Sequence, residues 1–474
     1  MKFLRDGSSA SSLSVRLSTL TGNELRSLIE RLANDGEAIA ARIEYLTRPQ
    51  SAVESIALRI GGIRNDDRFV DHGGLDEMAR VVRGVAEDIE RDVLPREPVR
   101  ALALTEQLMV LNGPLMNRSL DDGMIGMAIE EACALWLKIA RVVRESGALP
   151  KMDWVARLKE VAGQDDYGVR RAMLQQAHLL FDEPQLRAMA ESQEREAVAA
   201  LATEPGDLGA LDALDDLPRN PRVPTLVLQD IAKALQDPQL YNRAVRLHHV
   251  NPDDHALEAM ARFHLDCGDV TGALDILEPP WEGGRETVRL DLLDRAYGQL
   301  GDNALRIDVR RKRYQHLPCL WTYQALNELL DVPARQELRT QVSIDAVELR
   351  DVATAAQLLC AAGNWPLAQA ILLARAKEFD IILGTQLEPL AKEAEARGYP
   401  LMSVIIWRAL LNPILERGAS KAYYHAAQYL SELRRLAGTV DDHRGLPTHA
   451  EYEARLRERH GRKTGFWRQM SIRP

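Results

Sequence analysis

The residues most able to do chemistry in this chain lie near its C-terminus. His460, Arg462, Lys463, Phe466 and Trp467 place three basic side chains beside two aromatic rings within a short segment. Basic groups attract phosphates and acidic side chains, and aromatic faces stack on bases. Residues 455–474 hold six Arg and one Lys against one Glu, although the whole chain has a formal charge of −10. This segment is therefore a candidate docking or anion-binding element.

The same segment also suits a structural role. Phe466 and Trp467 would pack back onto the last helix, and the arginines would pair with the acidic body of the chain. Terminal units of helical repeats need such a cap. Arginine and tryptophan are common both in caps and at binding surfaces, so both interpretations stay open.

Two groups of His and Asp invite comparison with metal sites. The first contains Asp441, Asp442, His443 and His449, with His425 upstream, and the second contains His248, His249, Asp253, Asp254 and His255. Neither spacing matches a standard ligand pattern, and both residue types are common in polar turns. The second group is expected to form the turn before a helix, with an Asp as its cap. We predict no metal and no cofactor.

No motif of a known enzyme class is present. The segment Gly461-Arg462-Lys463-Thr464 lacks the first glycine of a phosphate-binding loop and follows no strand. Serine-hydrolase, zinc-protease, dinucleotide-binding and kinase signatures are missing from the sequence. We predict no catalytic residue, and an enzyme whose site forms only in the fold is the third alternative for function.

A second basic run, Arg310-Arg311-Lys312-Arg313, lies in a predicted helix. At helical spacing these four side chains point around the helix rather than along one stripe. We predict a solvated face, and a phosphate contact is the alternative.

A recurring hinge marks the elements that must position these residues. It is formed by Gly268-Asp269, Gly301-Asp302, Gly363-Asn364 and Gly398-Tyr399. The glycines are 33, 62 and 35 residues apart, and 62 is close to two units of 31. A period in the low thirties is typical of stacked helical hairpins of the tetratricopeptide type. The alternative is an irregular helical domain in which the glycines recur by coincidence.

The chemistry of the hinge supports the repeat. Glycine takes the left-handed conformation that ends one helix, and the following Asp or Asn caps the next. Before Gly268, the residues Leu257, Met260, Ala261 and Leu265 form one apolar stripe at helical spacing. The stretch from 320 to 350 lacks the glycine, so we predict one degenerate unit there.

Composition favours helix throughout. Leu, Ala, Arg and Glu dominate the 474 residues, and aromatic residues make up only 5%. The four cysteines are far apart and form no CxxC pair, which is typical of thiols in a reducing compartment. The N-terminus has no signal-peptide pattern, and no apolar run is long enough to span a membrane. These observations predict a cytoplasmic protein that does not enter a membrane.

The predicted architecture is all-α, with an N-terminal helical domain followed by a tetratricopeptide-like α-solenoid of antiparallel helix pairs, about five hairpins in number. We predict a disordered tail (1–14), an N-terminal helical domain (15–204), a Pro-, Gly- and Asp-rich linker (205–224), helical repeats (225–437) and a basic, aromatic C-terminal cap (438–474). Within the first domain, Thr21 and Glu24 are spaced as a capping box. Ile129, Cys133, Trp136 and Ala140 are spaced as a buried helical stripe.

The C-terminal region contains a distinctive series of segments: Tyr424–Leu430, Asp442–His449, Tyr452, Leu456-Arg457, His460–Lys463 and Phe466-Trp467. In these segments the chain resembles a bacterial domain-of-unknown-function family. Residues 166–186 and 25–32 are similar to the same family, and the C-terminal part also resembles the region that follows some SWIM zinc-finger domains. Leu446 stands where the pattern has an aromatic residue, and the SWIM zinc ligands are missing, so no zinc is implied. The resemblance implies a bacterial origin and a helical-repeat fold, and it brings no activity with it.

We therefore predict a non-enzymatic scaffold or adaptor that holds a peptide or helix of a partner protein in a groove of the solenoid. Six aromatic residues of the repeat region are expected to be mostly core, with one or two lining that groove: Trp281, Trp321, Trp365, Trp407, Tyr423 and Tyr424. Nucleic-acid or nucleotide binding through the C-terminal tail and the run at 310–313 is the second alternative.

Overall fold

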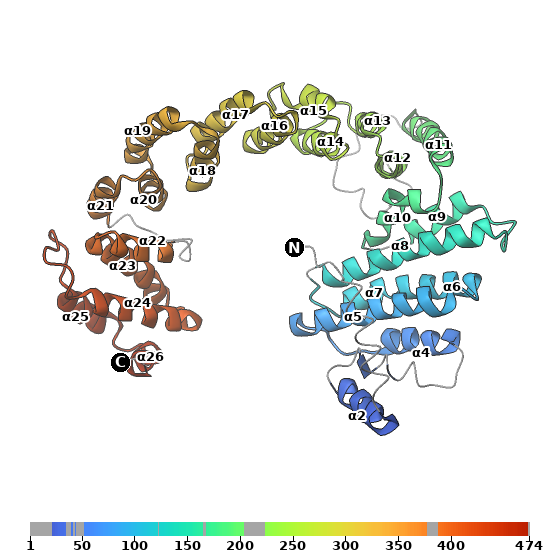
Figure 1. Ribbon diagram of the computed structural model, residues 1–474, viewed down its shortest axis with the longest axis horizontal. Helices are drawn as coiled ribbons and strands as arrows, with labels where there is room; N and C mark the ends of the chain where they lie inside the picture. Colours follow the sequence, from blue (N-terminus) through green and yellow to red (C-terminus); the bar gives the residue numbers. More distant parts are fainter. Residues whose placement is uncertain are drawn as a thin grey trace. The chain divides into compact units, whose positions relative to one another are not determined.

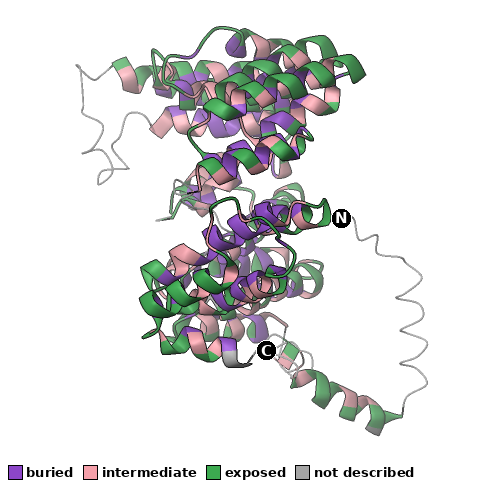
Figure 2. Cartoon of the chain, turned by 90° about the vertical axis from the view of Figure 1, so that its left-hand side faces the viewer, coloured by how far each residue is buried: buried purple, intermediate pink, exposed green. Residues whose placement is uncertain are grey.

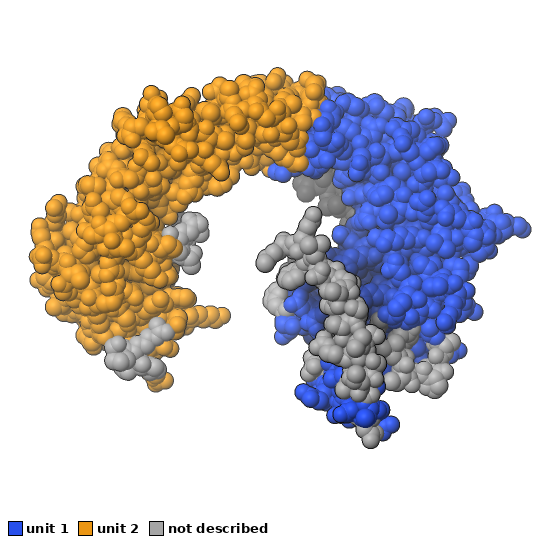
Figure 3. Space-filling model, viewed as in Figure 1, with its two compact units in different colours: residues 1–269 blue, residues 270–474 orange. Residues whose placement is uncertain are grey.

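Helices make up most of the part of the chain that the structure describes. The computed structural model describes residues 21–34, 39–40, 43, 52–121, 123–164, 167–202, 223–376 and 387–472. Within these ranges, the one β-type contact is an isolated bridge between Val70 and Ser119. The all-α prediction is confirmed. The chain divides into two compact units, residues 1–269 and 270–474 (Figure 3).

The first unit is built around one long buried helix. Its elements are α2 (Gly22–Ala33), α4 (Ala52–Asn65), α5 (His72–Asp88), η1 (Ile89–Val93), α6 (Pro98–Met109), α7 (Asn112–Asn117), α8 (Met124–Glu145), α9 (Trp154–Gly163), η2 (Val169–Arg171), α10 (Ala172–Gln175), η3 (Ala177–Leu179), α11 (Glu183–Ala202), α12 (Val223–Leu235), α13 (Pro238–His248) and α14 (Asp254–Asp266). Helix α8 packs against α5 and α6. Its predicted stripe is fully buried, and the Trp136 indole nitrogen donates to Glu106 Oε1 at 3.0 Å. The predicted capping box of Thr21 and Glu24 begins α2.

The second unit consists of helices that follow one another in sequence order (Figure 1). They are α15 (Val270–Leu277), α16 (Glu286–Leu300), α17 (Asn303–His316), α18 (Leu320–Leu329), α19 (Val332–Glu348), α20 (Val352–Ala361), α21 (Trp365–Ala374), α22 (Leu387–Ala396), α23 (Pro400–Arg417), η6 (Ser420–Ala422), α24 (Tyr423–Leu436), α25 (His449–His460) and α26 (Thr464–Ile472). Consecutive helices pack as pairs, including α16 with α17, α20 with α21 and α22 with α23. Each pair also contacts the next, for example through α17 and α18 or α19 and α20. This packing is that of a helical-repeat solenoid.

The predicted hinges have the backbone that their sequence requires. Gly268, Gly301, Gly363 and Gly398 all have positive φ, between 74° and 84°. At each one, the following residue donates its N–H to a carbonyl five residues back, and the glycine N–H donates three residues back. This is the Schellman arrangement, which a left-handed residue completes without steric strain only when it is glycine.

The polar residue after the glycine caps the next helix at two hinges. Asp302 accepts from the N–H of Leu305, and Asn364 accepts from the N–H of Leu367. At the first hinge, the Asp269 carboxylate lies 2.9 Å from His264 Nδ1.

The degenerate unit ends its first helix in another way. Leu330, at the end of α18, is extended (φ −77°, ψ 148°), and Asp331 then caps α19 by accepting from Ala334 N at 2.9 Å. An extended residue turns the chain without positive φ, so this hinge needs no glycine. The extended backbone at Leu330 therefore explains why the hairpin predicted at 320–350 has no glycine at its hinge.

Buried residues lie mainly where the helices of each unit face one another, and exposed residues lie mainly on the outer faces (Figure 2). In the second unit, a continuous apolar cluster runs from Ala346 to Met470, with Trp407 fully buried on α23. Among the described helices, none combines the length and the apolar character that crossing a membrane needs.

The predicted domain limits differ from the boundary between the two units. The tail (1–14) and residues 205–222 of the predicted linker lie outside the described residues. Helix α12, which follows the linker, packs against α11 and belongs to the first unit. The repeat region predicted at 225–437 therefore spans the division at residue 269, because its first helices share the core of the N-terminal unit.

Candidate functional site

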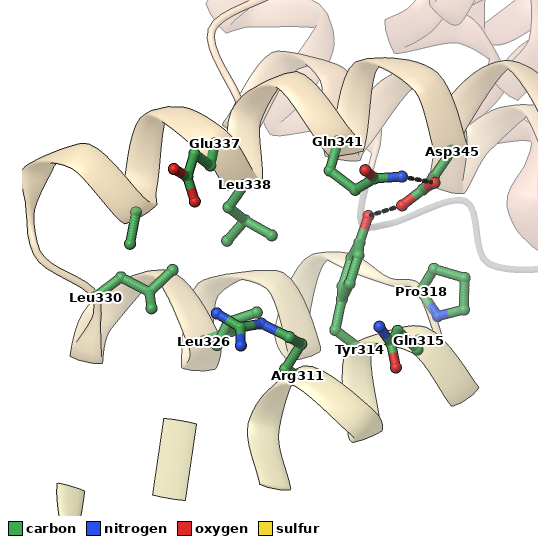
Figure 4. A pocket seen from close by; sticks show the side chains of 11 residues that line it. Arg311, Tyr314, Gln315, Pro318, Leu326, Leu330, Glu337, Leu338, Gln341 and Asp345 are labelled. Carbon is green, nitrogen blue, oxygen red and sulfur yellow. Dashed lines mark hydrogen bonds between the residues drawn. The ribbon is translucent and has the colours of Figure 1, made fainter. Parts of the chain in front are cut away.

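A cavity of about 560 Å³ lies between α17, α18 and α19 in the second unit (Figure 4). It is lined by Arg311, Tyr314, Gln315, Pro318, Leu326, Leu330, Ala334, Glu337, Leu338, Gln341 and Asp345. A volume in this range suits one large side chain with its neighbours, or a small organic molecule.

The cavity combines an apolar wall with a polar rim. Leu326, Leu330 and Leu338 are buried members of one core cluster, so their side chains form the wall. On the rim, the Tyr314 hydroxyl donates to Asp345 Oδ2 at 3.4 Å, and Gln341 Nε2 donates to Asp345 Oδ1 at 2.7 Å. Burial, and then the charge of Asp345, raise the pKa of Tyr314, so the phenol stays a neutral donor.

Two buried arginines hold the helix that carries Tyr314. Arg310 forms a bidentate ion pair with Asp294 of α16: its Nε lies 2.8 Å from Oδ1 and its Nη2 lies 2.9 Å from Oδ2. Arg313 Nη2 lies 2.6 Å from Asp291 Oδ1, and the Arg313 guanidinium covers the Trp321 ring at 3.6 Å. These contacts fix α17 against α16 and α18, and so fix one side of the cavity.

The same contacts correct the prediction for the run at 310–313. Arg310 and Arg313 are buried rather than solvated, and Arg311 and Lys312 are exposed. The reason is their spacing: residues three apart share one helix face. That face meets the acidic residues of α16, which the local sequence of the run does not reveal.

The C-terminal residues predicted as a site lie on α25 and α26, and the structure brings three of them together. Phe466 is fully buried, with its ring centroid 6.1 Å from that of Tyr423 on α24. The Trp467 indole nitrogen donates to the His460 carbonyl oxygen at 3.0 Å. His460 is itself buried, and burial, followed by the charges of Lys463 and Arg459, lowers its pKa.

The two remaining cations of this group are less buried than His460. Arg462 is exposed and Lys463 is half-buried. Two neighbouring arginines pair with acidic residues, Arg457 with Glu453 at 2.9 Å and Arg459 with Glu416 at 3.5 Å. The aromatic half of the predicted site therefore contributes to the core, and whether the cationic half binds an anion stays a prediction.

The candidate metal groups serve other purposes. Asp253 caps α14 by accepting from Ala256 N at 2.9 Å, and this hydrogen bond lowers the pKa of Asp253. His449 Nε2 lies 3.3 Å from Glu453 Oε2. Within the residues that the structure describes, no three His, Cys, Asp or Glu side chains come together as a metal site.

A buried histidine in the first unit has the hydrogen-bond partners of a catalytic dyad, but a substrate cannot reach it. His264 Nδ1 lies 2.9 Å from Asp269 Oδ2, and His264 Nε2 lies 2.7 Å from Asn242 Nδ2. Catalysis needs a ring nitrogen that reaches a substrate or nucleophile. The His264 side chain is 0% exposed and both nitrogens are engaged, so this group stabilises the fold.

Two of the six aromatic residues considered for a groove are exposed. Trp321 is 52% exposed beside Arg313, and Tyr424 is 49% exposed on α24. Trp281, Trp365 and Trp407 are buried, and Tyr423 packs against the core. Sequence reasoning did not find the lining of the cavity. Its leucines have the same apolar spacing as any core residues, and the cavity forms only where three helices pack around them.

The fold and the cavity define an all-helical protein of paired, stacked helices with a surface cavity in its second unit. A family model described as a family of unknown function, DUF6880, matches residues 25–469, and the chain belongs to this family. No curated protein and no solved structure matches the chain.

Proposed function

We propose that this protein is a non-enzymatic binding scaffold, and that its repeat unit holds a short segment of a partner protein at the cavity between α17, α18 and α19. The main support for this proposal is the cavity, which lies between three helices. Three leucines form its apolar wall, and charged and amide side chains border it. Interfaces draw most of their affinity from a few apolar anchors, while polar groups at the rim fix the register.

The rim determines the chemistry of the expected segment. Glu337 and Asp345 line the cavity together with a single cation, Arg311. Arg311 already lies 3.7 Å from Asp308. An apolar side chain followed by a basic residue would fill the wall and satisfy the acidic rim. We therefore propose a partner segment that carries a Leu- or Phe-type anchor next to Lys or Arg.

A tetratricopeptide-like character of the repeats is part of this proposal. So are a cytoplasmic location, a bacterial origin and the link to SWIM-associated proteins, which the family assignment leaves open.

Nucleic-acid binding has less support, since Arg310 and Arg313 are engaged with α16 and only part of the C-terminal tail offers exposed cations. Its signature would be a salt-dependent affinity for single-stranded oligonucleotides that decreases when Arg462 and Lys463 are both replaced by Ala.

The test is selection from a displayed library of random peptides against the whole chain, followed by affinity measurement for the selected peptides. We expect selected peptides to share an apolar and a basic residue. Glu337→Lys should weaken their binding by about tenfold, because a like charge at the rim opposes the basic residue.

The matched control is Glu348→Lys, which makes the same charge change at an exposed glutamate of the same helix outside the cavity lining. Peptides that bind both variants as well as they bind the unchanged chain would remove the cavity from the proposal. Failure to select any peptide would count against the scaffold function itself.

A further inference from the structure

A second cavity of about 560 Å³ in the same unit has a different chemistry. It lies beside α23 and is bordered by the connection before α25 and by α25 itself. Its lining consists of Ala376, Ile405, Arg408, Ala409, Asn412, Pro413, Glu416, Leu446, Pro447 and Tyr452. Most of these side chains are apolar, so the few polar groups among them stand out.

The central polar group is a buried arginine that has no acidic partner among the described residues. Arg408 is 8% exposed, its Nη2 donates to the Pro447 carbonyl oxygen at 2.8 Å, and its guanidinium lies 4.5 Å from the centre of the Tyr452 ring. Its Nε has no hydrogen-bond partner. Among the described residues, no carboxylate forms an ion pair with Arg408. A buried charge with no counter-charge is costly, and proteins rarely keep one without a use for it.

Two other buried arginines of this unit show the usual solution. Arg310 pairs with Asp294 at 2.8 Å, and Arg313 lies 2.6 Å from Asp291. Unlike these two, Arg408 has beside it, in the part of the chain that the structure describes, no carboxylate that balances its charge. The cavity that it lines is where that charge would be supplied.

The charged groups around Arg408 do not supply it. Burial lowers the pKa of Arg408, and the positive charge of Arg455 lowers it further, although a guanidinium stays protonated. Glu416 is the one acidic residue in the lining, and it is exposed and 3.5 Å from Arg459. His449 lies beside Glu453, at 3.3 Å. The cavity near Arg408 is therefore positive and poorly solvated.

Helix α23 adds two further polar groups to the lining. Asn412 Oδ1 accepts from the Tyr452 hydroxyl at 2.7 Å, which leaves the amide nitrogen of Asn412 as a donor. Pro413 lies inside α23 and has no N–H, so the Ala409 carbonyl lacks its usual intrahelical donor. A guanidinium and an amide donor thus border one apolar cavity, beside a helix turn that Pro413 deprives of one N–H donor.

We propose that this cavity binds a carboxylate carried on an apolar group, with Arg408 as the recognising cation. One guanidinium balances one negative charge, and its planar N–H groups match the two oxygens of a carboxylate. The apolar lining would hold the body of the ligand, and the volume suits a small organic acid or the last residues of a peptide. This site involves other helices than the proposed partner-binding cavity and does not depend on it.

The test uses the whole chain and pairs of probes that differ only in charge. Hexanoate and hexanamide represent a small acid, and N-acetyl-leucine and N-acetyl-leucinamide represent the end of a peptide. We expect each acid to raise the melting temperature with increasing concentration, and each amide to leave it unchanged. Tighter binding of N-acetyl-leucine than of hexanoate would indicate that the cavity takes the end of a peptide. Tighter binding of hexanoate would indicate a small organic acid.

Arg408→Met should abolish the effect of the acids, with affinity reduced about tenfold or more. Without ligand, this variant should melt no lower than the unchanged chain, since it removes an unpaired buried charge. Arg408→Lys keeps the charge but loses the planar guanidinium, so it should bind the acids with intermediate affinity. This variant replaces Arg408→Met in the test if the Met variant does not fold. Arg468→Met, at an exposed position outside the lining, is the control.

Three results would overturn the proposal: equal effects of acid and amide, equal effects of the acids on the unchanged chain and on Arg408→Met, or no effect of any acid. Stronger stabilisation by inorganic phosphate than by either acid would overturn the assignment to a carboxylate.

Discussion

Asp294 Oδ1 lies 2.8 Å from Arg310 Nε, and Asp294 Oδ2 lies 2.9 Å from Arg310 Nη2, so both carboxylate oxygens engage one guanidinium. Arg310 Nη1 also donates to the Ala325 carbonyl oxygen of α18. Arg306 adds a third contact to the same carboxylate at 3.1 Å. Arg310 thus joins α17 to α16 and α18, and α17 and α18 form two of the three sides of the first cavity.

We predict that Asp294→Ala destabilises the protein strongly. The substitution leaves the buried Arg310 guanidinium without its counter-charge, which costs about 3–5 kcal/mol at sites of this kind. Urea denaturation followed by circular dichroism measures the loss. Asp308→Asn is the control, because Asp308 pairs with Arg311 at 3.7 Å in an exposed position. Such a pair contributes less than about 1 kcal/mol. Similar losses in the two variants would show that burial of the pair is unimportant.

We predict that the hinge at Gly363 does not tolerate a side chain. Its φ is +84°, a conformation that costs an L-residue about 1–2 kcal/mol. Gly363→Ala should therefore lower the free energy of unfolding by about that amount, even though nothing lies within 4 Å of the added methyl group. The measurement is a comparison of denaturation midpoints.

Gly62 provides the matched control for this hinge. It lies in the interior of α4, and it too has nothing within 4 Å of an added methyl group. There, Gly→Ala should stabilise the helix by about 0.5–1 kcal/mol. The same substitution should thus have opposite signs at the two glycines, and equal signs would contradict the assignment of the hinge to backbone conformation.

The parts of the fold that follow from local chemistry could be predicted from the sequence. Gly301 and Gly363 marked their hinges because the left-handed turn and the cap that follows involve neighbouring residues only. The buried stripe of α8 could be predicted for the same reason, because the spacing of apolar residues along one helix shows which face is buried.

The parts that depend on distant partners could not be predicted. The burial of Arg313 is decided by Asp291, which lies on the preceding helix and outside any local pattern. The sequence around Arg408 does not distinguish it from other helical arginines. Only the packing of α23 against the connection at Pro447 buries it, with no carboxylate of the described residues beside it. The cavity lined by Tyr314 and Leu338 joins residues of separate helices. Charge and cavity are properties of the packed state, and sequence spacing does not show them.

We predict that the aromatic part of the C-terminal tail stabilises the fold. Phe466→Ala should cost about 3–5 kcal/mol, because the ring is 0% exposed and packs against α24. Deleting residues 460–474 should lower the melting temperature for the same reason. Arg468→Ala, an exposed residue of the same helix, should change stability by less than about 0.5 kcal/mol. An unchanged melting temperature for Phe466→Ala would refute the role of this segment as a cap.

The last prediction concerns acid stability at the junction of α24 and α25. Glu453 accepts from Arg434 at 2.8 and 3.1 Å and from Arg457 at 2.9 Å. The hydrogen bonds from Arg434, opposed by burial and aided by Arg457, lower the pKa of Glu453 to about 2 from an ordinary value of 4.5. The side chain is 17% exposed, so solvent screens these contacts only in part.

A lowered carboxylate pKa gives stability that is complete above the unfolded value and disappears as the pH falls through the folded value. Glu453 should therefore contribute up to about 3 kcal/mol above pH 4.5, and that contribution should be lost between about pH 4.5 and pH 2. Glu453→Gln should lower the free energy of unfolding at pH 7 and flatten its decline across this window, as measured by urea denaturation at a series of pH values. Glu458→Gln, at an exposed glutamate of the same helix, should leave both the stability and the slope unchanged. Parallel pH profiles for Glu453→Gln and the unchanged chain would mean that the ion pair with Arg434 does not link α24 to α25 in solution.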